Sequence, residues 1–231
     1  MKMQKIGALV TVELKKVYRD PMTLAVLLLM PVGLALIFYQ ALGNVSNAND
    51  YYPVPGMTHF EYLLPGVMGY AVIYMGMMVA LALVDNRQAG LLKWVEATPV
   101  SPSEYLGSLI IDNVFIAVFQ GLIVLLVARL LGFEPQGGFL GILIAIVFLA
   151  LLAVAAVGLG LITAAVAKES GAAAGLAMFV IVPMMMFGTF LAVFSDMTRN
   201  IARFMPNYYL TARCLSFSTP AASPTRSSGR I

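Results

Sequence analysis

The sequence predicts an all-α protein that crosses the membrane five times and carries an N-terminal amphipathic helix on the inner membrane surface. Hydrophobic residues make up 61% of the 231-residue chain and charged residues only 11%, whereas soluble domains contain about 45–50% and 25%. The apolar residues form five stretches, each long enough to cross a bilayer as a helix of about 20 residues. The stretches are Met22–Leu42, Leu63–Val84, Tyr105–Val127, Phe139–Ala167 and Gly171–Phe194. Helices are expected because a backbone in lipid must satisfy its own hydrogen bonds.

The first twenty residues predict the amphipathic helix. One side carries Ile6, Val10, Leu14 and Val17, and the other carries Lys5, Lys15, Lys16 and Arg19. This pattern is typical of a helix along the inner membrane surface, with its lysines toward anionic headgroups. Glu13 falls on the apolar side, which is costly unless its carboxylate has a partner. Two interpretations are open: the segment only orients the chain in the membrane, or Glu13 and Arg19 contact a cytosolic partner. Asp20 is expected to cap the first span, with Pro21 in its first turn.

Basic residues predict the orientation of the spans. With the N-terminus inside, the inner segments carry eight lysines and arginines and the outer loops carry one, Arg129. Five spans would also place residues 195–231 outside, and these carry Arg199, Arg203, Arg213, Arg226 and Arg230. The inner segments are 1–21, 85–104 and 168–170, and the outer loops are 43–62 and 128–138. The eight inner residues are Lys2, Lys5, Lys15, Lys16, Arg19, Arg87, Lys93 and Lys168. Because positively charged loops stay in the cytoplasm, we expect a multi-pass plasma-membrane protein with a cytoplasmic N-terminus.

The inner loop 85–104 predicts a rigid elbow at the membrane surface. A short helix from Leu91 to Ala97 should stop before Pro99. The next residues, Ser101-Pro102-Ser103-Glu104, form a capping box that opens the third span. The only tryptophan of the chain, Trp94, lies on the short helix, either as an interfacial anchor or as a contact to a partner.

Three polar residues lie within the third span: Asp112, Asn113 and Gln120. Asn113 and Gln120, seven positions apart, share one face of the helix. Asp112 directly precedes Asn113 and therefore lies on the adjacent side of the helix. Polar groups inside a bilayer are costly and usually face protein or water, so these three are candidate pathway residues. The alternative is that Asp112 only pairs with a neighbour near the inner interface.

The fourth and fifth spans are rich in small residues, which let helix backbones approach closely. These residues are Gly158, Gly160, Ala164, Ala165, Gly171, Ala172, Ala173, Ala174 and Gly175. Gly171 and Gly175, four positions apart, are the expected contact. Pro183 should kink the fifth span, and Met184–Met186 beside it form either lipid-facing filler or an adaptable surface.

Composition excludes several classes of function. The single cysteine, Cys214, excludes an internal disulfide and a cysteine metal cluster, and the single histidine, His59, leaves no histidine pair for catalysis. We therefore expect no catalytic residue, no metal site and no cofactor. The net charge of +3 gives no argument for nucleic acid, because the basic residues lie at the span ends. No Gly-x-x-x-x-Gly-Lys-Ser/Thr phosphate loop occurs, so ATP hydrolysis by that route is excluded.

Three groups of residues carry a family resemblance. They are Arg19-Asp20-Pro21; Arg87-Gln88-Ala89-Gly90-Leu91-Leu92 with Ala97-Thr98-Pro99-Val100-Ser101 and Tyr105-Leu106-Gly107; and Pro183 with Phe187-Gly188-Thr189-Phe190. With them, residues ~1–213 resemble the type-2 ATP-binding-cassette (ABC) exporter permeases, the membrane subunits of drug, lipid and polysaccharide efflux pumps. That family usually has glutamate where this chain has Gln88.

The resemblance implies three partners: a separate ABC ATPase subunit, a second permease subunit in a homodimer or heterodimer, and membrane lipid. It also implies that the ATPase contacts the inner loop. The implied contact residues are Arg87, Gly90, Leu91, Trp94, Glu96, Thr98 and Pro99. We therefore favour ATP-driven export of a drug, lipid or other amphipathic substrate. An ion-coupled secondary transporter that uses Asp112 and a non-transporting membrane assembly factor are the alternatives.

The C-terminal part departs from the family, which has six spans. The sixth should begin shortly after Tyr208-Tyr209-Leu210-Thr211, and no apolar stretch of that length follows. We expect a permease domain over residues 1–213, with an interfacial amphipathic segment over 197–210. Residues 214–231 are expected to be a disordered tail, because their Ser, Thr, Pro, Arg and Gly cannot bury a core. The abrupt change near Arg213 indicates a truncated or frameshifted end.

Overall fold

The computed structural model describes residues 2–42, 59–90, 100–132, 138–186 and 200–217. These residues form α-helices and no strand. The helices are α1 Lys2–Arg19, α2 Pro21–Leu42, α3 His59–Gln88, α5 Pro102–Leu130, α6 Gly138–Val166, α7 Ser170–Met185 and α9 Pro206–Phe217. The predicted all-α fold is confirmed.

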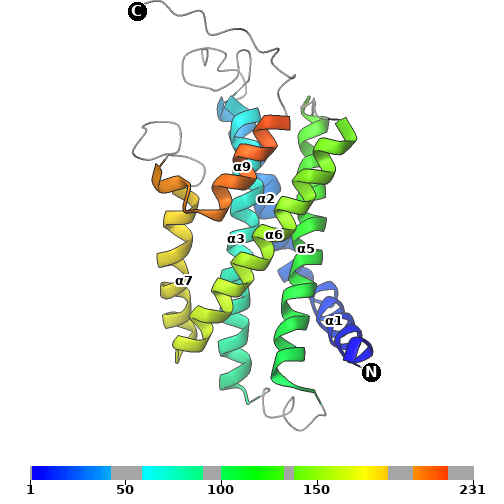
Figure 1. Ribbon diagram of the computed structural model, residues 1–231, viewed down its shortest axis with the longest axis vertical. Helices are drawn as coiled ribbons and strands as arrows, with labels where there is room; N and C mark the ends of the chain where they lie inside the picture. Colours follow the sequence, from blue (N-terminus) through cyan, green and yellow to red (C-terminus); the bar gives the residue numbers. More distant parts are fainter. Residues whose placement is uncertain (1, 43–58, 91–99, 133–137, 187–199, 218–231) are drawn as a thin grey trace, which may run out of the picture.

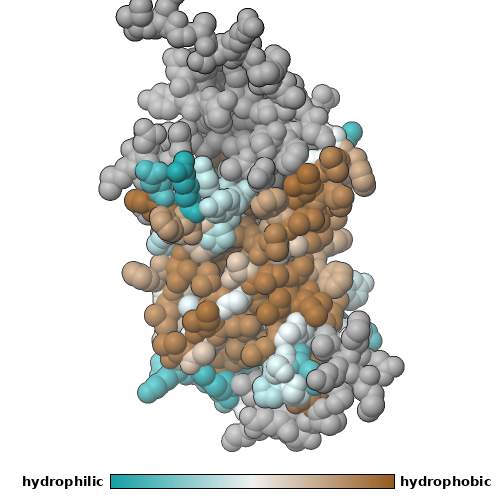
Figure 2. Space-filling model, in the orientation of Figure 1, coloured by the Kyte–Doolittle hydropathy of each residue, from teal (hydrophilic) through white to brown (hydrophobic). Residues whose placement is uncertain are grey.

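Among the described residues, four helices, α2, α3, α5 and α6, are long and apolar enough to cross a membrane. A fifth apolar helix, α7, has 16 residues and covers the first part of the predicted fifth span, whose residues 187–194 lie outside the described ranges. Figure 2 shows the apolar belt that these helices present between more polar ends. The protein is therefore a polytopic membrane protein.

The helix α3 lies at the centre of the bundle, and α2, α5, α6, α7 and α9 all contact it (Figure 1). Successive long helices run in opposite directions, and α6 crosses the others obliquely. The C-terminal end of α3, the N-terminal end of α5 and the turn between α6 and α7 therefore lie at the same end of the bundle, and α1 lies toward that end. This end gathers the segments that the basic residues predict to be inner.

Two glycines let α3 and α6 meet backbone to backbone. A Cβ atom at Gly160 would overlap the carbonyl oxygen of Gly76, and one at Gly76 would overlap the carbonyl oxygen of Ala156. Both approaches are far closer than van der Waals contact allows, so only glycine fits at either position. The predicted contact through Gly171 and Gly175 is wrong for the described part of the chain, since a Cβ at either position would meet nothing within 4 Å.

Asp20 and Ser101 cap the two helices that the sequence predicts them to cap. Asp20 Oδ1 accepts hydrogen bonds from the backbone N–H groups of Met22 at 3.1 Å and Thr23 at 3.3 Å, and its Oδ2 accepts one from the Thr23 hydroxyl at 2.5 Å. These bonds from Thr23 hold the pKa of Asp20 below its ordinary value. At α5, the Ser101 hydroxyl accepts from the Glu104 N–H at 3.3 Å, and the Ser101 N–H donates to Glu104 Oε2 at 2.9 Å. Both helix starts are therefore fixed in place.

The helix α1 is amphipathic, as predicted, and packs mainly against α5. Val10 is buried and Leu14 and Val17 are half-buried. The charged residues Lys15, Lys16 and Arg19 are exposed. The apolar side of α1 thus meets another helix of the same chain.

The helix α9 corrects the prediction of an interfacial segment over 197–210. It begins at Pro206 and packs against α3 and α6 instead of lying apart from the bundle. Its buried residues, which share one helical face, are Asn207, Leu210 and Thr211. The helix continues to Phe217, so its last turn includes residues that we predicted to be disordered. Residues 218–231 lie outside the described ranges.

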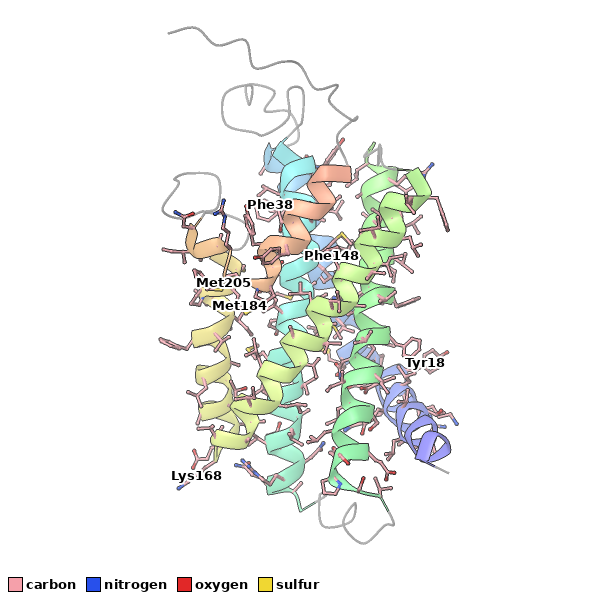
Figure 3. All side chains as sticks on the ribbon, viewed as in Figure 1. Tyr18, Phe38, Phe148, Lys168, Met184 and Met205 are labelled. Atoms are coloured by element: carbon pink, nitrogen blue, oxygen red, sulfur yellow. The ribbon has the colours of Figure 1, made fainter. Side chains whose placement is uncertain are left out.

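The methionines near Pro183 belong partly to the core. Met184 is 4% exposed and lies within the central apolar cluster, against which Met205 also packs (Figure 3). The interpretation of Met184 as lipid-facing filler is therefore wrong. Pro183 lies inside α7.

Candidate functional site

The end of α3 is tied to the turn between α6 and α7. The Arg87 guanidinium donates a hydrogen bond to the carbonyl of Ala167, and Gln88 Nε2 donates to the carbonyl of Lys168 at 3.0 Å. Beside them, the Ser170 hydroxyl donates to the carboxylate of Asp85. We call these three hydrogen bonds the α3–turn clamp. They join two segments that are 80 or more positions apart in the sequence.

The charges of the clamp match the partial charges of the helix ends. Ala167 directly follows α6, where the last carbonyl groups lack helical donors and carry partial negative charge, and Arg87 supplies a cation there. Ser170 is the first residue of α7, where unpaired N–H groups carry partial positive charge, and Asp85 supplies an anion. Each such pairing stabilises the structure by about 0.3–1 kcal/mol. The clamp is therefore favourable in both hydrogen bonding and electrostatics.

A glycine directs the chain as it leaves α3. Gly90 has a φ of +72°, and its N–H donates to the carbonyl of Arg87 at 3.1 Å. Other residues adopt this left-handed conformation at a cost of about 1–2 kcal/mol, so Gly90 fixes the exit direction beside the clamp. The other predicted ATPase contacts lie outside the described residues: Leu91, Trp94, Glu96, Thr98 and Pro99.

A cavity of about 420 Å³ lies between α1, α2, α3 and α5, toward the same end of the bundle. Most of its wall is apolar. Its charged lining residues are Glu13, Lys16, Asp20 and Asp112. Uncharged polar groups are contributed by Thr23, Tyr74, Asn86, Tyr105 and Asn113. We call this space the α1–α5 cavity.

Asp112 is buried in the wall of the α1–α5 cavity, with 3% of its surface exposed. Its Oδ1 accepts hydrogen bonds from the backbone N–H of Asn113 at 2.9 Å and from Asn113 Nδ2 at 3.2 Å. The position is ten residues into α5, about 15 Å along the helix axis and thus about half of a hydrocarbon core. Glu13 of α1, which is half-buried, lines the same cavity. Within the described part of the chain, no lysine or arginine pairs with Asp112.

Gln120, the third polar residue of this helix, lies apart from the cavity wall. It is buried and donates from Nε2 to the carbonyl of Leu27 in α2. The structure therefore brings Asp112 and Asn113 together at the cavity and places Gln120 at the contact of α2 with α5. Arg19, the other residue predicted to contact a partner, is exposed in the last turn of α1.

Sequence reasoning missed Asp85 and Ser170 of the clamp and Tyr105 and Asn86 of the cavity as functional candidates. A signal existed for the first pair: an acid ends one span, and a hydroxyl begins another on the predicted inner side. Tyr105 was noted only as part of the family resemblance, and no pattern pairs it with Asn86, because the two residues come from different helices.

Residues 4–212 match the family model described as ABC-2 type transporter. The match extends from α1 into α9 and includes both the α3–turn clamp and the α1–α5 cavity. Comparisons with curated proteins and with solved structures give no match.

Proposed function

Because the chain belongs to the ABC-2 type transporter family and is thus a membrane subunit of an ABC transporter, we propose that it is the permease of an ATP-driven exporter in the plasma membrane. ATP hydrolysis takes place on a separate ABC ATPase subunit. A second permease subunit, identical or related, completes the transport path. The end of the bundle that carries the clamp faces the cytoplasm, because the segments that gather there carry eight of the fourteen lysines and arginines of the chain.

The single observation that carries this proposal is the α3–turn clamp. The segment that follows Gly90 is attached on one side to α3 and on the other to α5, whose start is fixed by the Ser101–Glu104 capping box. Through Arg87 and Gln88, the end of α3 is also attached to the turn between α6 and α7. A force applied by an ATPase to residues 91–99 therefore acts on four helices together and not on one loop.

The transport step follows from this rigid connection. Closure of the two ATPases on ATP displaces the cytoplasmic end of each permease, and α3 and α5 carry the displacement into the membrane. Such coupling requires packed elements that move as units. The backbone contact between Gly76 and Gly160 supplies one, because it locks α3 against α6.

The helix α2 offers an apolar face to the second permease subunit or to lipid. Met22, Leu29 and Ile37 are 74%, 68% and 63% exposed and recur at seven- and eight-residue spacing, which places them on one side of the helix. Few residues of α2 are buried within the chain. This face is consistent with assembly of two permeases in the membrane.

Co-purification tests the proposal. The tagged full-length chain is extracted in mild detergent, and a bound ABC ATPase is identified by mass spectrometry and by its ATP hydrolysis. Aromatic residues at interfaces often carry about 2 kcal/mol or more of the binding energy, so Trp94→Ala with Glu96→Ala should reduce ATPase recovery about tenfold. The matched control is Lys168→Ala, because the Lys168 side chain is exposed at the same end of the bundle and points outward (Figure 3).

Equal recovery of the ATPase with the double variant and with the control would contradict the predicted contact. Transport without an ATPase or nucleotide would contradict the proposal as a whole.

A further inference from the structure

The wall of the α1–α5 cavity combines an apolar surface with an excess of negative charge. Among its charged residues, Glu13, Asp20 and Asp112 are acidic and Lys16 is basic. Asp20 is engaged at the start of α2, where its two oxygens accept three hydrogen bonds. Glu13 and Asp112 are therefore the carboxylates that remain for a ligand.

Neither of these two carboxylates has a cationic partner within the described part of the chain. Asp112 accepts hydrogen bonds only from Asn113, its own neighbour in α5. Glu13 forms no ion pair with Lys16, three residues on, whose side chain is exposed. Burying a carboxylate without a counter-charge is costly in a membrane helix. Both acids line the same cavity, so one positive charge between them would serve both.

The rest of the wall suits an apolar body. Leu27 of α2, Met75 and Met78 of α3 and Leu109 of α5 line it, and methionine side chains adapt to ligands of different shape. Met22 of α2 lines the cavity and is 74% exposed, so the cavity reaches the outside of the bundle beside this helix. A volume of about 420 Å³ lies within the range of sites for drug-sized molecules.

We propose that the α1–α5 cavity binds an amphiphilic organic cation, with its positive head between Glu13 and Asp112 and its apolar body against α2 and α3. The cavity lies toward the end of the bundle that is proposed to be cytoplasmic, so such a molecule enters from the inner half of the membrane. That it is then exported rests on the proposed function; that it binds does not.

Equilibrium binding of tetraphenylphosphonium to the purified full-length chain in an uncharged detergent tests this inference. Tetraphenylborate, which has nearly the same shape and the opposite charge, is the matched probe. We expect saturable binding of the cation and at least tenfold weaker binding of the anion. Because losing one charge of a buried contact commonly weakens binding tenfold or more, Asp112→Asn and Glu13→Gln should each weaken cation binding by about tenfold. Glu169→Gln is the control, since Glu169 is exposed on the α6–α7 turn and does not line the cavity.

Three results would overturn the inference: no saturable binding of tetraphenylphosphonium to the wild-type chain, equal binding of the two probes, or wild-type affinity in both acid variants. Both substitutions keep side-chain size, and either one suffices if the other does not yield a monodisperse protein. No ATPase is present in this measurement. Failure here with intact ATPase co-purification would overturn the binding inference alone, whereas cation binding without any co-purifying ATPase would overturn only the exporter proposal.

Discussion

Gln120 of α5 donates its side-chain amide to the backbone carbonyl of Leu27 in α2, an acceptor that has no helical donor because Pro31 stands four residues on. Proline lacks an N–H group, so the usual bond from residue 31 to residue 27 cannot form. In lipid an open carbonyl has no water to bond to, and a neighbouring helix must satisfy it. Gln120 thus joins α2 to the bundle at the position where α2 lacks a backbone hydrogen bond.

This relationship predicts that Gln120 and Pro31 are energetically coupled. Gln120→Met should lower the free energy of unfolding by about 1 kcal/mol, the scale of side-chain hydrogen bonds between membrane helices. In a Pro31→Ala background the same change should cost close to nothing, because the N–H group that the alanine restores then donates to the carbonyl of Leu27. Oε1 of Gln120 is buried without a hydrogen-bond partner in the described part of the chain, so its removal adds no cost. SDS titration of the full-length protein in mixed micelles measures all four free energies of the cycle. Additive effects would contradict the coupling.

The crossing of α3 and α6 predicts a sharp difference between two glycines on one helix. Gly160→Ala should destabilise the bundle by about 1–3 kcal/mol, as overpacking of a tight core does. The reason is that the new methyl group would overlap the carbonyl of Gly76. Gly158→Ala should be neutral or stabilising, because nothing lies within 4 Å of its added methyl group and alanine favours the helix. Thermal unfolding in one detergent compares the two, and equal midpoints would contradict the described crossing.

The helices and their N-terminal caps could be predicted from short stretches of the sequence. The apolar stretches predicted the helices because span length is set by bilayer thickness. Asp20 and the Ser101–Glu104 capping box act within four residues of themselves, so no tertiary information was needed to place them. The small residues around Gly160 also predicted close helix packing, but the sequence could not show which glycine contacts which helix.

Long-range partners could not be predicted in the same way. Arg87 bonds to Ala167, 80 positions away, and Gln120 to Leu27, 93 positions away. Both acceptors are backbone carbonyls, which every residue has, so no residue type in the sequence marks them. The α1–α5 cavity forms only when four helices pack together, so the sequence could not predict it. The sequence did mark Asp112 and Glu13 individually, as acidic residues in apolar surroundings.

Gln88 provides a further test of the clamp. Its amide donates to the carbonyl of Lys168, and a glutamate carboxylate has no proton to donate. Gln88→Glu should therefore lower the free energy of unfolding by about 0.5–1.5 kcal/mol, whereas Gln88→Lys keeps a donor and should recover most of the loss. The same SDS titration measures both. A stable glutamate variant beside an unstable lysine variant would contradict the assigned bond.

The orientation predicts which introduced cysteines are accessible from outside the cell. In a Cys214→Ser background, Arg129→Cys should react with an impermeant maleimide in intact cells, and Glu169→Cys should react only after permeabilisation. Both residues are exposed, and they lie at opposite ends of the bundle. Replacing Arg129 removes a positive charge from an outer loop, so the substitution does not weaken the charge bias. The opposite labelling pattern would contradict the assignment of the clamp to the cytoplasmic end.

Whether the clamp couples ATP hydrolysis to transport is measured on the co-purified complex in proteoliposomes, by comparing ATP hydrolysis and ATP-dependent transport between Arg87→Ala and Lys168→Ala. The first variant removes the cation that ties α3 to the α6–α7 turn. The second removes an exposed cation at the same turn, whose side chain is not part of the clamp. Loss of a hydrogen bond to a charged group amounts to about 1.5–3 kcal/mol, so Arg87→Ala should lower the transport driven by each ATP about tenfold, while Lys168→Ala should match the wild type. Because the Arg87 guanidinium is engaged by the Ala167 carbonyl, the other predicted contacts, Trp94 among them, should still hold the ATPase in Arg87→Ala. Wild-type coupling in Arg87→Ala, or a wild-type complex that hydrolyses no ATP, would contradict the account.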